Sequence, residues 1–574
     1  MLEFGIVNST ILDLDGICKI VKKKGRYYRP FFYSFIILTM KSNLFVILLV
    51  FLTACSESIK PVDTAVENQI LYIGNGTEPQ DLDPHIVTGV PESKVLMALL
   101  EGLVIRNPDG PAPLPGVAMN WEISNDGKTY TFYLRKNATW SNGDAVTAND
   151  FVYAWKRVLL PSLGSKYPDM LYDIVNAEEF NKGKIVDFSQ VGVKALDKNT
   201  LQVKLKNPAP YFLELLCHYT TRPVHQPTIE THGEIDTAGS QWTRPGNFVG
   251  NGPFTLDTWE LNKVIIVKKN PSYWNNAVVK LNEIHFFPVD NASREDLMFR
   301  SGQLHVTSTV PPEKVESYKE KYPDNIQVDP YYGTYYYRFN TEKAPFDNKL
   351  VRQALSLALD RTLIVEKVTK GGQKEAFSFT PPDPNSYFPP TTLEFDPTKA
   401  KELLKKAGYS DANPFPSVDL LYNTSEGHQK LAQAIQQMWK TTLNVDITLT
   451  NTDWKVYLSR QSIGDFQIAR AGWIGDYLDP KSFLDMMVTG RGNNQTGWSN
   501  KMYDNLLIAA ANSTSQVQRF DNFYEAEKIL MDEMPIIPIY TYTRIYMLHE
   551  DVQGWGNNLL DSRPYQFVYL ENKK

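Results

Sequence analysis

The chain has 574 residues, of which 42% are hydrophobic and 22% charged, and this composition is typical of a globular protein with sizeable cores. The formal net charge of −6 is mild for this size and argues against a nucleic-acid-binding protein, which usually presents a basic patch. The three cysteines, Cys18, Cys55 and Cys217, form no CxxC motif and no Cys/His set has zinc spacing, so we expect no metal site.

The N-terminal region contains an export signal. Residues 40–55 read MKSNLFVILLVFLTAC, with one lysine followed by an apolar run. That run is shorter than the about 20 residues needed to span a membrane, and the layout is that of a secretory signal. The last four residues, LTAC, resemble the bacterial lipobox. We therefore expect residues 40–54 to be a lipoprotein signal peptide and Cys55 to carry a lipid that anchors the protein to a membrane.

Residues 1–39 do not fit this layout, because they contain a second apolar run at 31–38. One interpretation is that translation starts at Met40 and that residues 1–39 are a mis-called extension. The alternative is an uncleaved membrane helix over 31–52, although polar residues interrupt it. Residues 55–68 are polar and are expected to form a tether.

The body of the chain carries both strand and helix signals. Short strands are predicted at 71–73, 129–134, 201–205, 264–268 and 445–449, where β-branched or alternating apolar residues dominate. Thr147 and Asp150 have the spacing of a capping box, which predicts a helix from Ala148 onward. Further helices are predicted over 350–358, 397–408 and 431–439, and the tyrosine-rich stretch 331–340 is expected to be extended. Helices that alternate with strands indicate an α/β fold.

Eight segments, spread in order over the chain, carry a family resemblance. They are GNGTEPQDLDPH (74–85), GVPESKVLMALLEGL (89–103), ATWSNGDAVTANDFVYAWKR (138–157), NGPFTLDTW (251–259), KNPSYWNN (269–276), YYYRFNTEKAPFDNKLVRQALSLALDR (335–361), LLYNTSEGHQKLA (420–432) and ARAGWIGDYLDPKSFLDMM (469–487). Together they resemble the bacterial extracellular solute-binding proteins of family 5, and within it the oligopeptide-binding type.

The resemblance implies an α/β, periplasmic-binding-protein-like fold of type II, cluster C, with two lobes joined by two crossing strands and an additional domain. Lobe I would combine residues 69–90, 226–332 and 544–574. The additional domain would be residues 91–225, and lobe III residues 333–543.

The resemblance also implies a function. A monomer would bind short peptides in the cleft between the lobes and deliver them to the permease and ATPase of an ABC importer, at the periplasm or the outer face of the membrane. The alternative keeps the fold and changes the solute to a dipeptide, a murein tripeptide, nickel or haem. A surface adhesin that has kept the fold is a third interpretation.

No enzyme is expected. The sequence contains no G-x-S-x-G, P-loop, H-E-x-x-H or G-x-G-x-x-G motif, and the resemblance implies no cofactor.

Asp476 is the predicted partner of a peptide ammonium, because a buried cation needs a carboxylate and the resemblance places the family aspartate here. An aspartate after glycine is otherwise most often a turn residue. Asp479, which precedes Pro480, has the position of a helix cap and so has a structural role of its own, whereas Asp476 has none.

A peptide carboxylate needs a cation, and Arg470 can hold it with two parallel bonds. By resemblance, His428 and Lys367 face the cleft at other depths, so that peptides of different lengths would find a cation. From the residues alone, Lys367 reads equally well as a solvated helix position and His428 as a polar residue at a helix start.

The ligand backbone is expected to pair as an added strand with residues 471–473, where Gly472 allows close approach and Trp473 lines the cleft. By resemblance, further cleft positions are Glu78, Asn251, Trp454, Tyr542 and His218, the last of which reads equally well as a packed histidine. Ile474 and Gly333 stand where the family can have cysteines, which suggests a missing disulfide.

Overall fold

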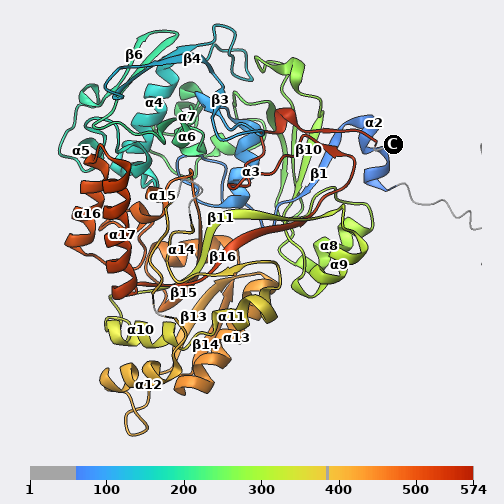
Figure 1. Cartoon of the computed structure of the whole chain (residues 1–574). Helices are drawn as coiled ribbons and strands as arrows, with labels where there is room; N and C mark the ends of the chain where they lie inside the picture. The colour runs from blue at the N-terminus through green and yellow to red at the C-terminus, as the bar shows by residue number, and fades with distance from the viewer. Residues whose placement is uncertain (1–59, 383–386, 393, 573–574) are drawn as a thin grey trace, which may run out of the picture. The chain divides into compact units, whose positions relative to one another are not determined.

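Three sheets of four or more strands organise the computed structural model, which describes residues 60–382, 387–392 and 394–572 (Figure 1). The expected extension 1–39, the signal peptide 40–54 and the lipidation site Cys55 lie outside these ranges. Residues 58–574 form one compact unit. Within the described ranges, no helix combines the length and the apolar character that a membrane span requires.

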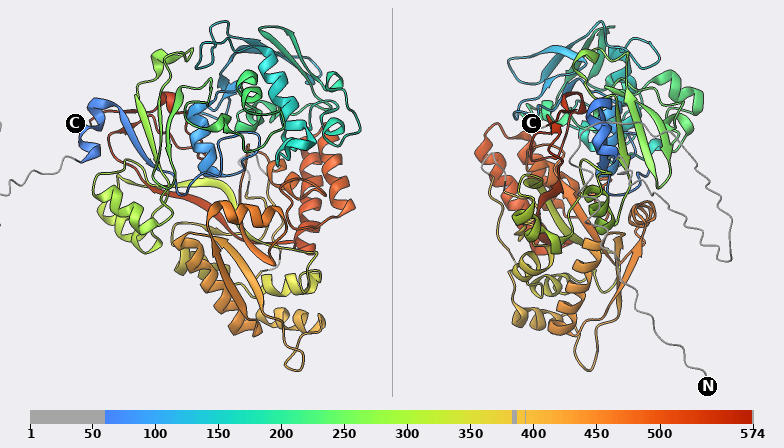
Figure 2. Two further views of the ribbon diagram at one scale, coloured as in Figure 1. Left: turned by 180° about the vertical axis from the view of Figure 1, so that it is seen from behind. Right: turned by 90° about the vertical axis from the view of Figure 1, so that its right-hand side faces the viewer.

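The first sheet gathers strands that lie far apart in the sequence. Its order is β1 (Ile70–Gly74), β10 (Glu283–Phe287), β9 (Val264–Lys269) and β8 (Phe254–Glu260), with β1 parallel to β10 and the other pairs antiparallel. The predicted strands 71–73 and 264–268 are confirmed. The C-terminal segment returns to β1, where Gln69 Nε2 donates to the Leu570 carbonyl over 2.7 Å (Figures 1 and 2).

The second sheet is antiparallel and belongs to the expected additional domain. Its order is β4 (Ala118–Ile123), β5 (Thr129–Leu134), β7 (Thr200–Lys204) and β6 (Val193–Asp197). Helix α4 (Ala148–Leu159) packs against it and begins with the predicted capping box, in which the Asp150 carboxylate accepts from the Thr147 backbone over 2.6 Å. Phe151 and Trp155 of this helix are fully buried, so the amphipathic pattern of the sequence marks the core face.

The third sheet has six strands. Its order is β12 (Lys374–Glu375), β16 (Ile536–Met547), β11 (Ile326–Phe339), β15 (Ile468–Ile474), β13 (Val418–Asn423) and β14 (Ile447–Thr452). The helices next to it include α10 (Lys349–Leu357), α12 (Pro397–Lys406), α13 (Glu426–Leu443), α14 (Trp454–Ser462), α16 (Lys501–Asn512) and α17 (Gln516–Glu533). The predicted helices and the extended tyrosine-rich stretch are confirmed.

Strands β11 and β16 join two hydrophobic cores. Ile326 at the start of β11 packs with Met547 of β16 in a small core with Val315, whereas Tyr337 and Ile537 pack in the core under the six-stranded sheet. Their pairing is irregular between Pro330 and Thr334. Proline lacks a backbone donor, so the ladder is interrupted where the strands cross from one lobe to the other (Figures 1 and 2).

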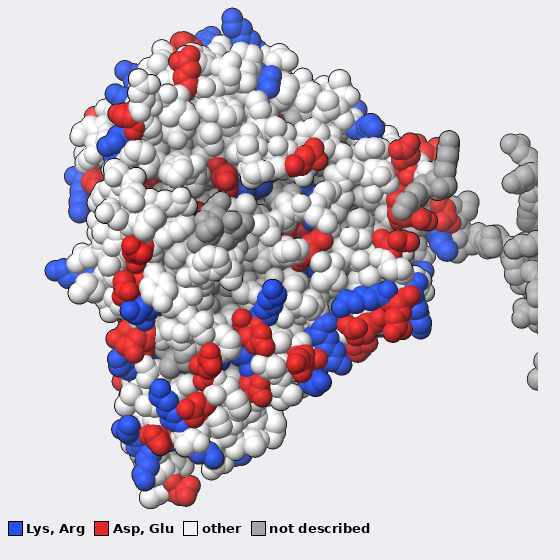
Figure 3. All heavy atoms as spheres, in the orientation of Figure 1, with Lys and Arg blue, Asp and Glu red and all other residues white. Residues whose placement is uncertain are grey.

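Short elements complete the described chain. They are α2 (Ala65–Asn68), α3 (Val90–Leu99), α5 (Ala177–Asn181), α6 (Phe212–Leu215), α7 (Gln226–His232), α8 (Ala292–Arg300), α9 (Val315–Lys321), α11 (Arg361–Leu363), α15 (Lys481–Leu484), β2 (Val104–Ile105), β3 (Leu114–Pro115), β17 (Val552–Gln553) and β18 (Tyr569–Leu570). On the face shown in Figure 3, acidic and basic side chains are interspersed.

The tether predicted for 55–68 is wrong over its second half. Residues 61–64 form a 3-10 helix and α2 follows it directly. Val62 and Ala65 are buried, and the Val62 amide donates to the Gly302 carbonyl over 3.1 Å. These two apolar side chains bury enough surface to hold a segment that is otherwise polar.

Candidate functional site

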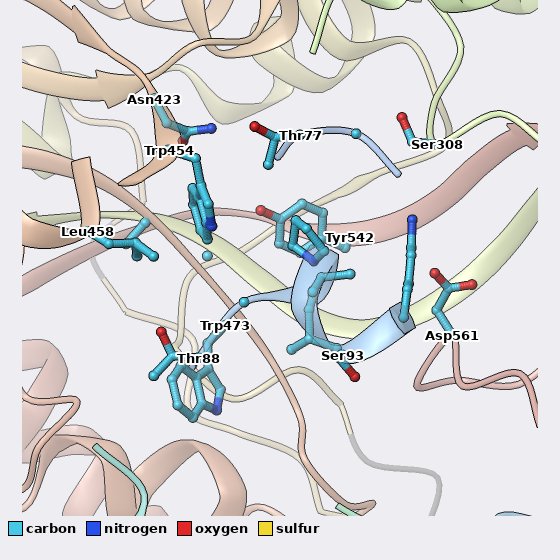
Figure 4. A pocket seen from close by; sticks show the side chains of 18 of the residues that line it. Thr77, Thr88, Ser93, Ser308, Asn423, Trp454, Leu458, Trp473, Tyr542 and Asp561 are labelled. Atoms are coloured by element: carbon cyan, nitrogen blue, oxygen red, sulfur yellow. The ribbon is translucent and has the colours of Figure 1, made fainter. Parts of the chain in front are cut away.

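A cavity of about 440 Å³ lies between the segments that carry the first sheet, the additional domain and the six-stranded sheet (Figure 4). Its wall includes the turn after β1, helix α3, the residues around His218 and strand β15. Of the predicted site residues, eight line it: Asp476, Arg470, Gly472, Trp473, His428, Trp454, Tyr542 and His218. The structure therefore brings together most of a set that spans more than 300 positions of the sequence.

Strand β15 presents an open backbone edge to this cavity. On one side it pairs with β11 from Gly333↔Ile474 to Phe339↔Ile468. On its other side, β13 pairs only with Ile468 and Ala469, so no described strand occupies the edge of residues 471–474. Unpaired strand edges accept an added strand, so this edge can hold an extended backbone as the sequence predicts.

Asp476 is buried at the cavity wall, and no lysine or arginine of the described residues lies within 4 Å of its carboxylate, although the charge of Arg106 acts on it from farther away. Its side chain is 9% exposed, and its Oδ1 lies 3.3 Å from His218 Nε2. Ser482 Oγ lies 3.5 Å from the other carboxylate oxygen. Burial, together with the charge of Asp169, raises the pKa of Asp476 to about 8. A cation that entered the cavity would stabilise the ionised form.

His218 supports Asp476 as a neutral donor. Burial, and then the charges of Arg106 and Arg222, hold the pKa of His218 well below its usual range. Its Nδ1 accepts from the Thr220 backbone over 3.4 Å, so the proton of the neutral ring is on Nε2 and faces Asp476. The imidazole orients the carboxylate but does not neutralise it.

Asp479 has a structural role, as predicted, although Pro480 and not Asp479 is the N-cap of α15. The Asp479 carboxylate accepts from the Lys481 backbone at the start of α15 over 2.9 Å and forms a two-bonded pair with Arg519, at 2.6 and 2.8 Å. Unlike Asp476, it does not line the cavity.

Arg470 is the cation that the sequence predicts. Its Nη1 donates to Asn423 Oδ1 over 3.3 Å and its Nη2 to the Tyr542 hydroxyl over 3.1 Å, while the guanidinium lies over the Tyr335 ring at 5.0 Å. No carboxylate of the described residues lies within 4 Å of it, and its Nε has no partner. These neutral contacts fix the guanidinium and leave its charge available to an anion.

His428 lines the cavity, but it is not the second cation that was predicted. Burial and the nearby charge of Arg470 hold its pKa well below the usual range, so the imidazole is neutral. Its Nδ1 lies 3.4 Å from the Tyr335 hydroxyl. The residue can offer a hydrogen bond to a ligand but no positive charge.

Three predicted residues lie outside the cavity wall. Lys367 belongs to a π-helical stretch, Ile364–Thr369, and its side chain is 67% exposed beside Glu366. Glu78 accepts from the Trp259 indole over 2.5 Å and from the Asn262 backbone over 2.8 Å. Asn251 exchanges two hydrogen bonds of 2.9 Å with the backbone of Glu101. Glu78 and Asn251 are held by protein groups, and the Lys367 side chain is exposed to solvent.

The predicted aromatic residues form part of the cavity wall (Figure 4). Trp473 donates to the Ser482 carbonyl over 2.7 Å, and Trp454 donates to Glu92 over 3.1 Å. A Cβ at Gly472 would collide with the Tyr542 hydroxyl. Glycine at this position therefore lets Tyr542 reach Arg470, in addition to keeping the strand edge open.

The predicted pair Gly333 and Ile474 are direct partners across β11 and β15. A Cβ on Gly333 would meet the Ile474 side chain, so the two positions that can carry cysteines are adjacent in space. The free Cys217 is buried elsewhere on the cavity wall.

Several cationic residues of the wall were missed. Lys94, Arg106 and Arg338 line the cavity, although none was predicted. Lys94 had no sequence signal, because it follows Glu92 and Ser93 in the polar first half of helix α3. Arg106 and Arg338 had none either, since arginines on strands and loops are common on surfaces.

Known proteins match most of the chain. The family model described as bacterial extracellular solute-binding proteins, family 5 middle, matches residues 112–495. The chain is 39% identical over 517 residues to the periplasmic oligopeptide-binding protein OppA of Escherichia coli, covering 88% of this chain and 93% of the relative. The structure of Haemophilus influenzae OppA in complex with the peptide RPPGFSPFR matches with a TM-score of 0.84 at 36% identity, covering 88% of this chain and 99% of the other.

Two structures of one relative differ in how well they match. The Escherichia coli murein tripeptide-binding protein MppA gives a TM-score of 0.84 at 37% identity, covering 88% of this chain and 99% of the other. The unliganded open form of MppA gives 0.60, with 88% and 98% covered. These likenesses confirm the predicted α/β, two-lobed fold, and the lobes here are arranged as in the peptide complex rather than as in the open form.

Proposed function

Because the chain belongs to family 5 of the bacterial extracellular solute-binding proteins, we propose that it binds short oligopeptides in the cavity and delivers them to an ABC importer. An extended peptide brings an ammonium to Asp476, a carboxylate to Arg470 and a row of amides to the open edge of β15. Each of these groups needs a partner when it leaves water, since an unpaired buried polar group is costly.

The observation that carries this proposal is the buried carboxyl of Asp476, which has no lysine or arginine of the described residues within 4 Å and whose pKa is raised to about 8. A ligand ammonium beside it would lower this pKa and complete a buried ion pair. Solutes without an amine, such as haem, leave Asp476 unpaired. Among the solutes considered, the site therefore favours those with a free amine.

Calorimetry with two forms of trialanine tests the proposal. The peptide with free termini should bind, and its N-acetylated form should bind about thirtyfold to several thousandfold more weakly, because acetylation removes one member of a buried charge pair. Equal affinity of the two forms would contradict the role of Asp476. Mass spectrometry of the ligand after binding should recover it intact, since we propose no hydrolysis.

The closed arrangement belongs to the ligand-holding state in this proposal. Groups from different lobes already contact each other: Trp454 donates to Glu92 over 3.1 Å, and Asn291 donates to Glu426 over 2.6 Å. A ligand that touches both lobes stabilises this arrangement over an open one by its differential affinity. Small-angle scattering should show a more compact protein with trialanine than without it.

We also propose that the protein is exported, works as a monomer, and is held at the membrane by a lipid on Cys55, at the periplasm or the outer cell face. The support is the signal layout of residues 40–55. Radiolabelled palmitate should enter the wild-type protein and not a Cys55→Ser variant. Equal labelling of both would contradict the anchor.

A further inference from the structure

The cavity wall carries more positive than negative charge. Its basic residues are Lys94, Arg106, Arg222, Arg338, Arg470 and Arg544, and its acidic residues are Asp290, Asp476 and Asp561. A peptide with one ammonium and one carboxylate is neutral overall and leaves this excess uncompensated. Uncompensated charge in an enclosed site favours a ligand of the opposite sign.

Most of the arginines are engaged by the protein. Arg544 pairs with Asp561 over 2.7 Å. Arg222 donates to the carbonyls of Leu96 and Leu100, at 2.9 and 2.7 Å. Arg106 donates to the backbone carbonyl of Asp476, and Arg338 to Gln495 and to the Tyr336 hydroxyl. Arg470 is already assigned to the ligand carboxylate, so Lys94 is the cation whose role is open.

Lys94 has no ion pair or hydrogen bond with any described residue, although it is partly buried. The acidic residues whose charges act on the Lys94 ammonium are Asp561 and Glu295. Asp561 is held by Arg544 and, over 3.1 Å, by Arg563. Glu295 accepts from the Ser308 backbone and hydroxyl, at 2.8 and 2.7 Å. Burial and the charge of Arg544 lower the pKa of Lys94 to about 8, which an anion from outside would reverse.

Lys94 and Arg470 lie at different ends of the cavity. In Figure 4, Ser308 and Asp561 are on one side, and Asn423 and Trp454 are on the opposite side. Arg470 belongs to the Asn423 side through their 3.3 Å contact, and Lys94 belongs to the side of Asp561. The cavity therefore offers two separate cationic positions and one anionic position, Asp476.

Tyr331 adds a neutral donor on the Asp561 side of the cavity, where Lys94 also lies. It lines the cavity near Asp561 and Arg544, and its hydroxyl bonds no described residue. An ammonium and a phenol on one wall can share a carboxylate, since each contributes a hydrogen bond to it.

We propose that the cavity selects peptides with a second carboxylate, an Asp or Glu side chain, and that Lys94 pairs with it while the Tyr331 hydroxyl donates to it. The inference rests on the proposed peptide-binding function. It adds a charge preference that the three-point contact with a peptide's termini and backbone does not give.

Calorimetry with matched peptides tests this preference. The peptides are Glu-Ala-Ala, Ala-Glu-Ala and Ala-Ala-Glu, each with its glutamine counterpart, which has the same size without the charge. At least one Glu peptide should bind the wild type about tenfold or more tightly than its counterpart, the usual gain for a charge-assisted hydrogen bond in an enclosed site.

Variants assign the preference to Lys94. In Lys94→Gln, the affinities for the Glu peptide and its Gln counterpart should differ by no more than about twofold. The affinity of this variant for the Gln peptide should stay within about twofold of the wild-type value. Lys94→Arg should keep part of the preference, because it keeps the charge. Lys367→Gln, which removes an exposed lysine outside the cavity, should keep all of it. Thermal melting checks that the variants are folded.

Two results overturn the inference while leaving peptide binding intact: equal binding of every Glu and Gln peptide to the wild type, or a preference that survives in Lys94→Gln. If no peptide binds at all, the proposed function itself fails, and the inference fails with it.

Discussion

Asp476 and Asp479 lie three residues apart and are about equally buried, yet the fold treats them differently. Asp479 receives two hydrogen bonds from Arg519 and one from the start of α15. Asp476 receives contacts only from a neutral imidazole and a hydroxyl. The first aspartate is part of the scaffold. The second has its pKa raised to about 8 by burial, so a cation in the cavity would favour its ionised form.

The arginines show the same contrast. Arg519 uses its guanidinium to close a pair inside the protein, whereas Arg470 is held by Asn423, Tyr542 and the Tyr335 ring and keeps its charge for the cavity. Neutral hydrogen bonds position a charged group without consuming its charge. A buried ionisable side chain whose hydrogen-bond partners are all uncharged therefore identifies a ligand-binding residue better than burial or residue type alone.

Breaking the scaffold pair should have the largest effect. Arg519→Leu leaves Asp479 buried without its cation, which should lower the free energy of unfolding by about 3–5 kcal/mol. Urea denaturation of the ligand-free protein measures this. A loss under about 1 kcal/mol, the range of an exposed pair, would show that solvent or relaxation satisfies Asp479.

Replacing the Asp476 carboxyl should weaken ligand binding. Asp476→Asn should weaken the binding of trialanine by about 2–5 kcal/mol, since the ligand ammonium loses its carboxylate. Asp324→Asn is the matched control, because Asp324 is exposed in a loop away from the cavity. Calorimetry on the three proteins measures the effect. An unchanged affinity in Asp476→Asn would remove Asp476 from the site.

The scaffold was predictable from sequence where a local rule decides the structure. Thr147 and Asp150 predicted the start of α4, and the alternating residues 129–134 predicted β5 to the residue. The structure of segment 61–68 was not predicted, because its two buried side chains, Val62 and Ala65, pack against residues that are distant in the sequence. Two isolated apolar residues form no pattern that the sequence alone would reveal.

Asp476 and Arg470 were predicted from the family resemblance together with the charges that peptide termini require, and both line the cavity. The charge state of His428 was not predictable, because it depends on burial and on the distance to Arg470. Lys367 is not part of the cavity wall, because its side chain is 67% exposed, at the solvated helix position that the residues alone allowed. Lys94 was overlooked because a lone lysine on a helix is usually a solvated residue.

Arg470 should show a smaller effect that depends on the ligand. Arg470→Gln should weaken trialanine binding by about 1.5–3 kcal/mol, the usual value of a hydrogen bond to a charged group. It should weaken the C-terminal amide of the same peptide much less, because that ligand carries no carboxylate. A double-mutant cycle over both proteins and both ligands isolates the contact. Equal losses for acid and amide would assign Arg470 to the cavity structure instead.

The same Asp476→Asn variant should also gain stability, by an amount that depends on pH. Burial raises the pKa of Asp476 to about 8 in the folded protein, above its ordinary value of 3.8, so the ionised side chain disfavours folding. The wild type should therefore lose stability from this group as the pH rises from about 4 to about 8, and the amide should not. In the ligand-free state, Asp476→Asn should therefore be more stable than the wild type at pH 8, and this gain should shrink toward pH 4. Urea denaturation across this pH range measures the difference. A gain that does not change with pH would mean that packing, and not the buried charge, separates the two proteins.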